Sequence, residues 1–546
     1  MEDEEDEEPA PAPVPGKGKR GRKRKQPTIE LPSPPEFTPL IRPESKKAGI
    51  RLPPALDLGV PAPISLFRLF FTDSMLDTIM ANTNLYAISK EAGSLGRAWY
   101  PLDMDELVTW IALTVYIGLH RMSTFELCWN MNKQEPVHMI SQYMKQIRYE
   151  QIKRYLHVSA PDATIINYFD KLEPLLSHIR DSSKKYYTPA TNVSVDEMMI
   201  RFSGRSAHTV HMKNKPTPEG FKIFSLCASG YTYTFLPTSR IIPAQIDKVD
   251  GLTQTGSIVN HLVRQLPYTR LPFNIYMDNY FTSTKLFQQF KNDGIGACGT
   301  VRRQAGIPKE LQVDKAIKLD WDTRSGIVMG GVLAVFWQDN GPVTMMTTIH
   351  GMVGEEWEVM RERRRPRDTS TNATRVRSIF GDSPWKELKI LKVIDEYNHH
   401  MGGVDIADQL RSYYSTQQTT RRNWMPIFFW ILDTTIINCC LIAREKESLL
   451  THREFRQTLI WELIRAVHHK NKSLRRDMDQ EEERSRKREK VTKYFQLPDL
   501  RLAPGDHYPE WRATRATCQW CSWRSLRKEI VMNHKPQPES VLVHRM

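Results

Sequence analysis

Four aspartates have the surroundings and the spacing that a metal site built from carboxylates would need. Asp196 lies in an otherwise apolar predicted strand, Asp278 ends another, and Asp405 and Asp408 are three positions apart near a predicted helix start. Side chains three positions apart share one face of a helix. Carboxylate oxygens suit Mg²⁺, and two such ions can activate a water or a 3′-hydroxyl and stabilise the leaving oxygen in phosphoryl transfer. Helix caps and surface acids would produce the same spacing, so both interpretations stay open at this point.

The elements that would position these acids alternate along the middle of the chain. Strands are predicted at 192–200, 221–228, 231–236 and 273–277, and helices at 257–266 and 284–292. Strands followed by alternating strands and helices indicate a mixed α/β layer. Because successive residues of a strand point to opposite faces, Glu197 should face away from Asp196 and be a poorer ligand.

Apolar periodicity predicts mainly helical regions on both sides of this layer. In the region 64–187, a helix should begin after the N-cap Asp103, which has Glu106 three positions later, and should end at Gly118 in the C′ position. A β-rich piece at 308–389 interrupts the alternating pattern, and an insertion is the simplest explanation for it.

The composition points to a protein that meets a polyanion in a reducing compartment. Lys and Arg number 77 against 63 Asp and Glu, which gives a net charge of +14 and a pI near 9.3. This balance favours nucleic acid as a partner. Seven cysteines are too few and too irregular for a secreted disulfide scaffold. The apolar stretch 424–443 is long enough to span a bilayer, but Pro426, Asp433 and Asn438 favour a buried core helix and no membrane.

The first 63 residues have the composition of a disordered tail. They contain 14 of the 35 prolines, with acidic and basic blocks and almost no aromatic residues, so they cannot bury enough apolar area to offset the entropy of ordering. Seven consecutive acids follow Met1, which is unlike the basic start and apolar run of a signal peptide. The basic cluster 17–25 suits nuclear import or contact with a DNA minor groove, with a solvated charge run as the alternative; its accessible position in the tail favours nuclear import.

An ordered set of short motifs carries a resemblance to a known family. The motifs are Lys-Tyr-Tyr-Thr-Pro (185–189), Ser-Val-Asp-Glu (194–197), Phe-Ser-Gly-Arg-Ser (202–206), Lys-Asn-Lys-Pro (213–216), Tyr-Met-Asp-Asn-Tyr-Phe-Thr-Ser (276–283), Gly-Thr-Val-Arg (299–302) and Gly-Gly-Val-Asp-Ile-Ala-Asp-Gln (402–409). In this order they closely resemble the piggyBac family of DDE/D transposases, from about residue 64 to residue 494.

The resemblance implies an α/β fold with an RNase H-like catalytic core, a β-rich insertion and a split, mainly helical domain for dimerisation and DNA binding. The implied segments are a disordered tail (1–63), the N-terminal segment of the helical domain (64–190), the N-terminal segment of the core (191–307), the insertion (308–389), the C-terminal segment of the core (390–411), the C-terminal segment of the helical domain (412–500) and a C-terminal tail (501–546).

The resemblance also implies roles for individual residues. Asp196, Asp278 and Asp405 match the family's catalytic carboxylates and would hold two Mg²⁺ ions, for which Mn²⁺ could substitute; Asp408 matches a fourth required acid. DNA contacts are implied for the basic residues near the acids and for the segment after the third acid, namely Arg205, Lys213, Lys215, Arg302, Arg303, Arg421, Arg422 and Trp424. Ordinary surface charge for the basic residues, and a buried aromatic anchor for Trp424, are the alternatives.

The C-terminal tail departs from the cysteine-rich zinc module with which the family often ends. Cys518 and Cys521 form a CxxC pair, but only His534 and His544 follow, with nine residues between the two histidines instead of three to five. We therefore expect a remnant of a zinc site, no tightly bound zinc, and disorder after about residue 523.

The leading hypothesis is a nuclear, Mg²⁺-dependent DNA transposase that acts as a homodimer on double-stranded DNA, cutting at transposon ends and inserting at TTAA sites. The alternative is a domesticated, transposase-derived nuclear DNA-binding protein without transposition activity. The four intact acids favour catalysis, whereas the incomplete cysteine module favours domestication.

Overall fold

The structure of the protein is a computed structural model. The described residues are 30–40, 47–94, 97–132, 136–213, 215–241, 244, 246–302, 306–313, 317, 319–369 and 373–468, together with three short strands after residue 508. The chain divides into two compact units, Met1–Leu463 and Ile464–Met546. The first unit holds all four aspartates.

Helices dominate the beginning of this unit. They are α1 (Pro54–Asp57), α2 (Pro63–Phe70), α3 (Asp73–Ser89), α4 (Met104–Leu119), α5 (Gln146–Tyr155) and α6 (Leu175–Tyr186). The predicted N-cap of α4 is confirmed, because the Asp103 carboxylate accepts the Glu106 N–H at 2.7 Å. The predicted end at Gly118 is wrong: Gly118 lies inside α4, where the backbone of Ser415 passes so close that a Cβ would meet its carbonyl oxygen at 3.0 Å.

A large mixed sheet follows, and its central strands match the predicted ones. The antiparallel members are β3 (Asn192–Arg201), β4 (Val210–His211), β5 (Glu219–Ala228) and β6 (Tyr231–Thr238), and β7 (Asn274–Met277) and β8 (Gly296–Thr300) run parallel to β3. Helices α7 (Gln254–Val263) and α8 (Thr284–Asn292) connect them. The alternation of strand and helix that the sequence predicts is therefore confirmed for residues 254–300.

The region predicted as an insertion is divided between two sheets. Strands β9 (Arg324–Met329), β10 (Val332–Gln338) and β11 (Pro342–Thr347) extend the large sheet, because β11 pairs with β8. Strands β12 (Glu358–Arg364) and β13 (Trp385–Leu391) pair with each other in a separate ribbon, and the short α9 (Ala373–Val376) lies between them in sequence. The region is β-rich as predicted, but its first half continues the central sheet through main-chain hydrogen bonds.

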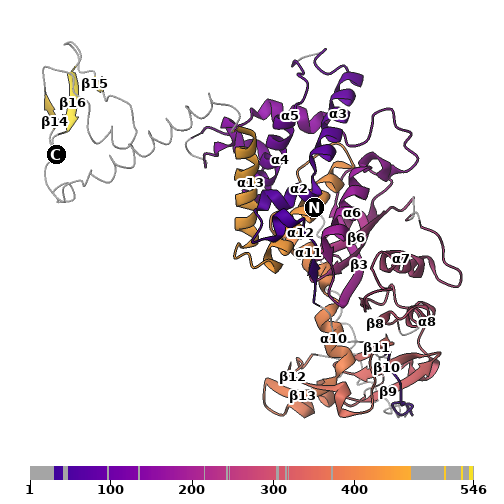
Figure 1. Cartoon of the computed structure of the whole chain (residues 1–546). Helices are drawn as coiled ribbons and strands as arrows, with labels where there is room; N and C mark the ends of the chain where they lie inside the picture. Colours follow the sequence, from indigo (N-terminus) through magenta and orange to yellow (C-terminus); the bar gives the residue numbers. More distant parts are fainter. Residues whose placement is uncertain are drawn as a thin grey trace, which may run out of the picture. The chain divides into compact units, whose positions relative to one another are not determined.

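Helices return after this region. Figure 1 shows α10 (Lys392–His400) leading from the end that holds β9–β13 to the end that holds α11 (Gly403–Tyr413) and α12 (Met425–Glu445). Among the described residues, α12 is the one helix long and apolar enough to cross a membrane. It is almost entirely buried and packs against α2, α6 and α11, so the prediction of a buried core helix is confirmed.

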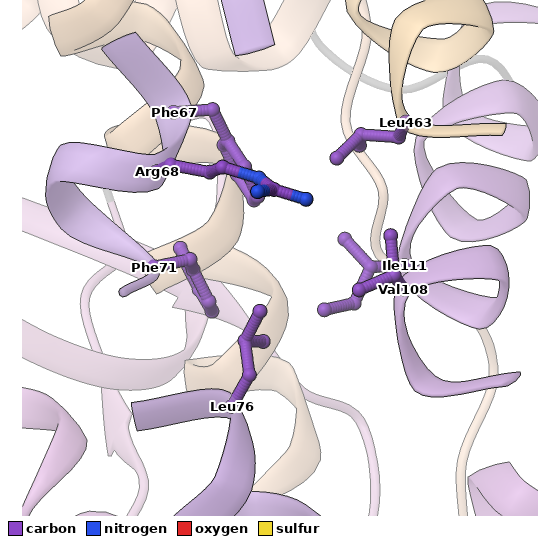
Figure 2. Close-up of a pocket in the computed structure, with 7 residues that line it drawn as sticks. All are labelled: Phe67, Arg68, Phe71, Leu76, Val108, Ile111 and Leu463. Carbon is purple, nitrogen blue, oxygen red and sulfur yellow. The ribbon is translucent and has the colours of Figure 1, made fainter. Parts of the chain in front are cut away.

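The helix α13 (His452–His468) adds to this helical packing through its residues up to Leu463. Figure 2 shows a narrow gap in the packing, lined by Phe67, Arg68, Phe71, Leu76, Val108, Ile111 and Leu463. The gap has no room for even a water molecule, so it offers no ligand site.

Some of the predicted disordered tail is placed against the folded unit. Leu40 donates its N–H to the Thr348 carbonyl at 2.8 Å, and Ser325 donates to the Pro32 carbonyl at 2.6 Å. The short strand β1 (Gly49–Ile50) pairs with β2 (Tyr187–Thr188). The expectation of disorder is thus wrong for residues 30–40 and 47–63, because main-chain hydrogen bonds can hold a segment that has few apolar residues. The acidic block and the basic cluster 17–25 lie outside the described residues.

The second unit is described mainly by three short antiparallel strands. They are β14 (Pro509–Trp511), β15 (Val531–Met532) and β16 (Ser540–His544), in the order β14–β16–β15. Two of them lie in the segment for which we expected disorder. Cys518, Cys521 and His534 lie outside the described residues.

Candidate active site

Asp196 and Asp278 lie side by side on neighbouring parallel strands. Val195 of β3 pairs with Met277 of β7, so the next residue on each strand is one of the two aspartates. The Asp196 carboxylate is 7% exposed and its Oδ1 accepts the Glu197 N–H at 2.7 Å. The strand β7 ends at Met277 because the chain turns there, with Asp278 Oδ1 accepting the Tyr280 N–H at 2.8 Å.

Both carboxyl groups of this pair are harder to ionise than an ordinary aspartate. Burial is the main cause, and it raises the pKa of Asp196 to about 7, with further increases from the charges of Glu197 and Asp278 and a decrease from Lys215. Burial also raises the pKa of Asp278, although the Tyr280 N–H partly opposes it. A buried carboxylate and a half-buried one that repel each other form a site with a preference for a cation.

The third aspartate is brought to this strand by a close helix contact. A Cβ on Gly403 would lie 2.6 Å from Ser194 Oγ and 3.2 Å from the Cys227 carbonyl, so glycine permits α11 to approach β3 this closely. Asp405 follows two residues later and is exposed.

Asp408 is engaged in holding the helix to the sheet. Its Oδ1 accepts N–H groups of Arg411 at 3.0 and 3.2 Å, and Arg411 also donates to the Met199 carbonyl of β3 at 3.2 Å. An aspartate in this position orients α11, and it is not grouped with the other acids.

The structure places together only some of the ligands that a divalent cation would need. The buried Asp196 and the half-buried Asp278 offer oxygen ligands of the type that Mg²⁺ prefers. Within the part of the chain that the structure describes, however, no three His, Cys, Asp or Glu side chains are gathered closely enough to hold a metal ion. The structure therefore assembles the first two ligands and leaves Asp405 outside the group.

Glu197 faces away from Asp196, as the strand geometry predicts. In the pairing with β5, Glu197 lies opposite Phe224 and Asp196 lies opposite Ser225. The buried Glu197 carboxylate forms ion pairs with Lys215 at 3.4 Å and with Lys222 at 3.8 Å. Glu197 is thus the partner of two lysines at the back of the strand.

The implied DNA contacts near the acids fall into two groups. Arg205 and Lys213 are exposed, and Arg205 helps to line a shallow depression formed by residues 203–207, Thr209 and Glu219. Arg302 is exposed beside the Asp278 turn, with its Nε 3.4 Å from Asn279 Oδ1. In contrast, Lys215 is half-buried and ion-paired. Arg303 lies outside the described residues.

Arg422 and Trp424 do not fit their implied DNA contacts. Arg422 donates to the carbonyls of Arg154 and Leu156 at the end of α5, and burial lowers the pKa of its guanidinium to about 10. Trp424 is 4% exposed and lies under the Arg422 guanidinium at 4.5 Å. A side chain covered in this way cannot stack on a base, so the alternative of a buried anchor is confirmed for Trp424, and Arg422 is likewise a packing residue. Arg421 is exposed.

Tyr280 is a surface feature that the motif contained but to which sequence reasoning assigned no role. Its ring is 41% exposed, next to Asp278, with the Lys222 ammonium 4.7 Å and the Arg302 guanidinium 5.7 Å from the ring centre. An aromatic ring with two cations beside buried acids suits contact with a nucleic acid, since bases stack on aromatic rings and phosphates pair with cations. The juxtaposition depends on pairing between β3, β5 and β7, which no local sequence signal reveals.

Comparisons with known proteins identify a family for this chain. A family described as "Transposase IS4" matches residues 62–440. Human piggyBac transposable element-derived protein 2 is 23% identical over 70% of this chain, and human piggyBac transposable element-derived protein 3 is 24% identical over 73%. The alignments span 62% and 64% of those two relatives, so this chain matches less than two thirds of their length.

A solved structure shares the fold. It is the cryo-electron microscopy structure of a piggyBac transposase synaptic complex with hairpin DNA, which superposes with a TM-score of 0.63 at 20% identity and covers 91% of this chain and 97% of that one. The family match extends over most of the unit that holds the four aspartates. The chain therefore belongs to the transposase IS4 family and, within it, to the piggyBac transposases.

Proposed function

We propose that the protein is a DNA transposase that cleaves double-stranded DNA at transposon ends and joins them to TTAA target sites. The observation that carries the proposal is the pair formed by the buried Asp196 and the half-buried Asp278 at adjacent positions of parallel strands, with the helix that bears the exposed Asp405 held against β3 by the Gly403 contact. The order of the central strands, β6–β5–β3–β7–β8 with the last two parallel to β3, supports the RNase H-like core that the resemblance implies.

In this proposal Asp196 and Asp278 hold the first divalent cation, Mg²⁺ or Mn²⁺, and Asp405 completes the set once DNA is bound. Bound Mg²⁺ would supply charge stabilisation at the phosphate and a more acidic water or hydroxyl nucleophile. The chain's own contribution is to hold the two carboxylates at adjacent register positions, and to fix α11 through the Asp408–Arg411 contact with β3.

DNA binding is proposed for the exposed cations around the acids, chiefly Arg205, Lys213 and Arg302, with Arg421 further along the helical region. Such cations position phosphates without reading sequence. The hairpin DNA in the complex of the structurally similar transposase supports a DNA substrate. We further propose a homodimer in the nucleus, with import through the basic cluster 17–25.

A second candidate function is DNA binding without transposition. It is favoured by the absence of a three-ligand acid group in the described residues and by relatives whose names call them transposable element-derived proteins. In this case the exposed cations would still bind DNA, and the acid pair would have no reaction to perform.

A nicking assay on plasmids that carry candidate terminal repeats tests the proposal. Wild-type protein with Mg²⁺ or Mn²⁺ should nick the DNA, and Asp196→Asn, Asp278→Asn and Asp405→Asn should each abolish nicking while retaining DNA affinity. The matched control is Asp77→Asn, an exposed acid on α3. Full nicking by any of the three active-site variants would refute the assignment, and wild-type binding without nicking would support the second candidate.

A further inference from the structure

Tyr280 is an exposed aromatic residue whose backbone is tied to one of the candidate active-site acids. Its N–H donates to Asp278 Oδ1 at 2.8 Å, so the ring lies within one side-chain length of that carboxylate. The exposed tyrosine and tryptophan residues in the described part of the chain are Tyr100, Tyr280, Trp385 and Tyr413. Among these four, Tyr280 is the residue that is hydrogen-bonded to one of the four aspartates.

The Tyr280 ring is held in place from the protein side. It packs edge-on against the buried Phe281, with ring centres 5.1 Å apart and ring planes at 82°. The Lys222 ammonium group lies 4.7 Å from the centre of the Tyr280 ring and 4.7 Å from that of Phe224. Lys222 is itself buried and pairs with Glu197 at 3.8 Å. Because Lys222 covers the ring from the buried side, the exposed 41% of Tyr280 faces away from Lys222.

An exposed cation accompanies this ring. The Arg302 guanidinium lies 5.7 Å from the centre of the Tyr280 ring, and its Nε is 3.4 Å from Asn279 Oδ1. A fixed aromatic surface beside a cation suits a nucleotide, since the base stacks on the ring and the phosphate pairs with the cation. In a paired duplex both faces of a base are covered by its neighbours, so a ring on the protein surface reaches a base face only where the base has left the stack.

We propose that Tyr280 is a stacking platform for one unpaired base of the DNA strand that lies at Asp278. This inference rests on the proposed DNA-binding function and adds the kind of nucleotide that the site selects. Arg302 pairs with the phosphate backbone next to that nucleotide, and Tyr280 holds its base outside the duplex. The site therefore prefers DNA in which a base is already unpaired, because an intact duplex must first lose the pairing and stacking of that base.

Equilibrium binding of the full chain to short labelled duplexes, measured by fluorescence anisotropy without divalent cations, tests the proposal. Three duplexes of one sequence are compared: one fully paired, one with a single unpaired thymine, and one with an abasic residue in place of that thymine. The wild type should bind the unpaired thymine about tenfold more tightly than the abasic residue, as expected for one base stacked on an aromatic ring. Tyr280→Leu should lose this preference, and Tyr280→Phe, which keeps the ring, should retain it.

Tyr100→Leu is the matched control, because Tyr100 is a tyrosine that is 69% exposed and lies far from Asp278 in the sequence. It should keep the preference of the wild type. Tyr280→Leu should bind the fully paired duplex as the wild type does, which also shows that this variant is folded. A retained preference in Tyr280→Leu, an equal loss of affinity for all three duplexes, or a lost preference in Tyr100→Leu would overturn the proposal.

A fluorescent base analogue gives a second measurement that does not depend on affinity. With 2-aminopurine at the unpaired position and saturating protein, the wild type and Tyr280→Phe should quench its emission by stacking, and Tyr280→Leu should not. Equal quenching by all three proteins would overturn the platform.

Binding and cleavage outcomes together separate this inference from the proposed function. If the preference depends on Tyr280 but the wild type does not nick candidate transposon ends with Mg²⁺, the stacking platform stands and the transposase assignment fails. If the wild type nicks those ends but binds the unpaired thymine and the abasic residue equally, the assignment stands and the platform fails.

Discussion

Two buried acidic sites in this protein differ in what balances their charge. In the helical region, Asp433 of α12 accepts N–H groups from Arg456 at 3.1 Å and from the Thr416 backbone at 2.9 Å, with both charged side chains at most 1% exposed. In the sheet, Asp196 and Asp278 share a site with no arginine within ion-pair distance among the described residues. Burial raises the pKa of the carboxyl group at both sites, but only Asp433 has a fixed cation to oppose it.

The difference separates a carboxylate that stabilises the fold from carboxylates kept available for a ligand. The Arg456 guanidinium is a rigid group that donates from Nη1 to Asp433 and from Nε to the neutral ring of His452, whose pKa burial lowers to about 3. Near the sheet site, the half-buried Lys215 forms its ion pair with Glu197, and the ion pairs of the described residues include none with Asp196 or Asp278. Four substitutions test this contrast, and the largest effect is expected first.

Asp433→Ala should be severely destabilising. It leaves the Arg456 guanidinium buried without its carboxylate, which costs about 3–5 kcal/mol of unfolding free energy in comparable buried pairs. Urea unfolding followed by tryptophan fluorescence measures the loss. Asp57→Ala, which removes the more exposed partner of Lys446, is the control and should cost less than about 1 kcal/mol. Equal losses of unfolding free energy in Asp433→Ala and Asp57→Ala would show that burying the Asp433–Arg456 pair does not increase the cost of breaking it.

Asp196→Asn should raise the unfolding free energy, whereas Asp433→Ala lowers it. The neutral amide removes a buried charge that is repelled by Asp278, so the metal-free protein should gain on the order of 1 kcal/mol at pH 8. The same urea experiment detects the gain, and Mn²⁺ should stabilise the wild type but not this variant. A loss of stability comparable to that of Asp433→Ala would place Asp196 among the structural acids.

The pH dependence of stability should also differ between wild type and Asp196→Asn. Asp196 has a pKa of about 7 in the folded chain against an ordinary value of 3.8, so the folded state binds the extra proton between these values. The contribution of Asp196 to the unfolding free energy is therefore fully present below about pH 4, and it is lost as the pH rises toward 7. The difference in Tm between variant and wild type, measured without metal, should grow across this range; a constant difference would contradict the shifted pKa.

The smallest effect should distinguish two arginines for which the family resemblance implied the same role. Arg302→Ala should weaken DNA binding several-fold and lower the slope of log affinity against log salt by about one, as expected for one lost phosphate contact. Arg422→Ala should leave that slope unchanged and lower Tm instead, because its guanidinium caps the end of α5. Fluorescence anisotropy with a labelled duplex at several salt concentrations measures both slopes.

The sequence by itself determined the family and the main elements, and it predicted which acids form the site. The motifs around Asp196, Asp278 and Asp405 occur in a specific order, and the strands that carry the first two show clear apolar runs, so local patterns sufficed. The helical N-cap at Asp103 and the burial of α12 are likewise properties of short segments, and both are confirmed.

Only the tertiary structure decided which charged side chains are exposed and which are packed against other parts of the protein. Arg302 and Arg422 look alike in sequence, but one lies beside Asp278 and the other is buried against the end of α5, 268 positions before it in the chain. Glu197 lies on β3 and Lys215 in the turn after β4, and their ion pair exists because β4 and β5 fold back on β3. Burial and pairing of this kind arise from contacts between residues distant in sequence, whereas composition and periodicity report only on neighbours.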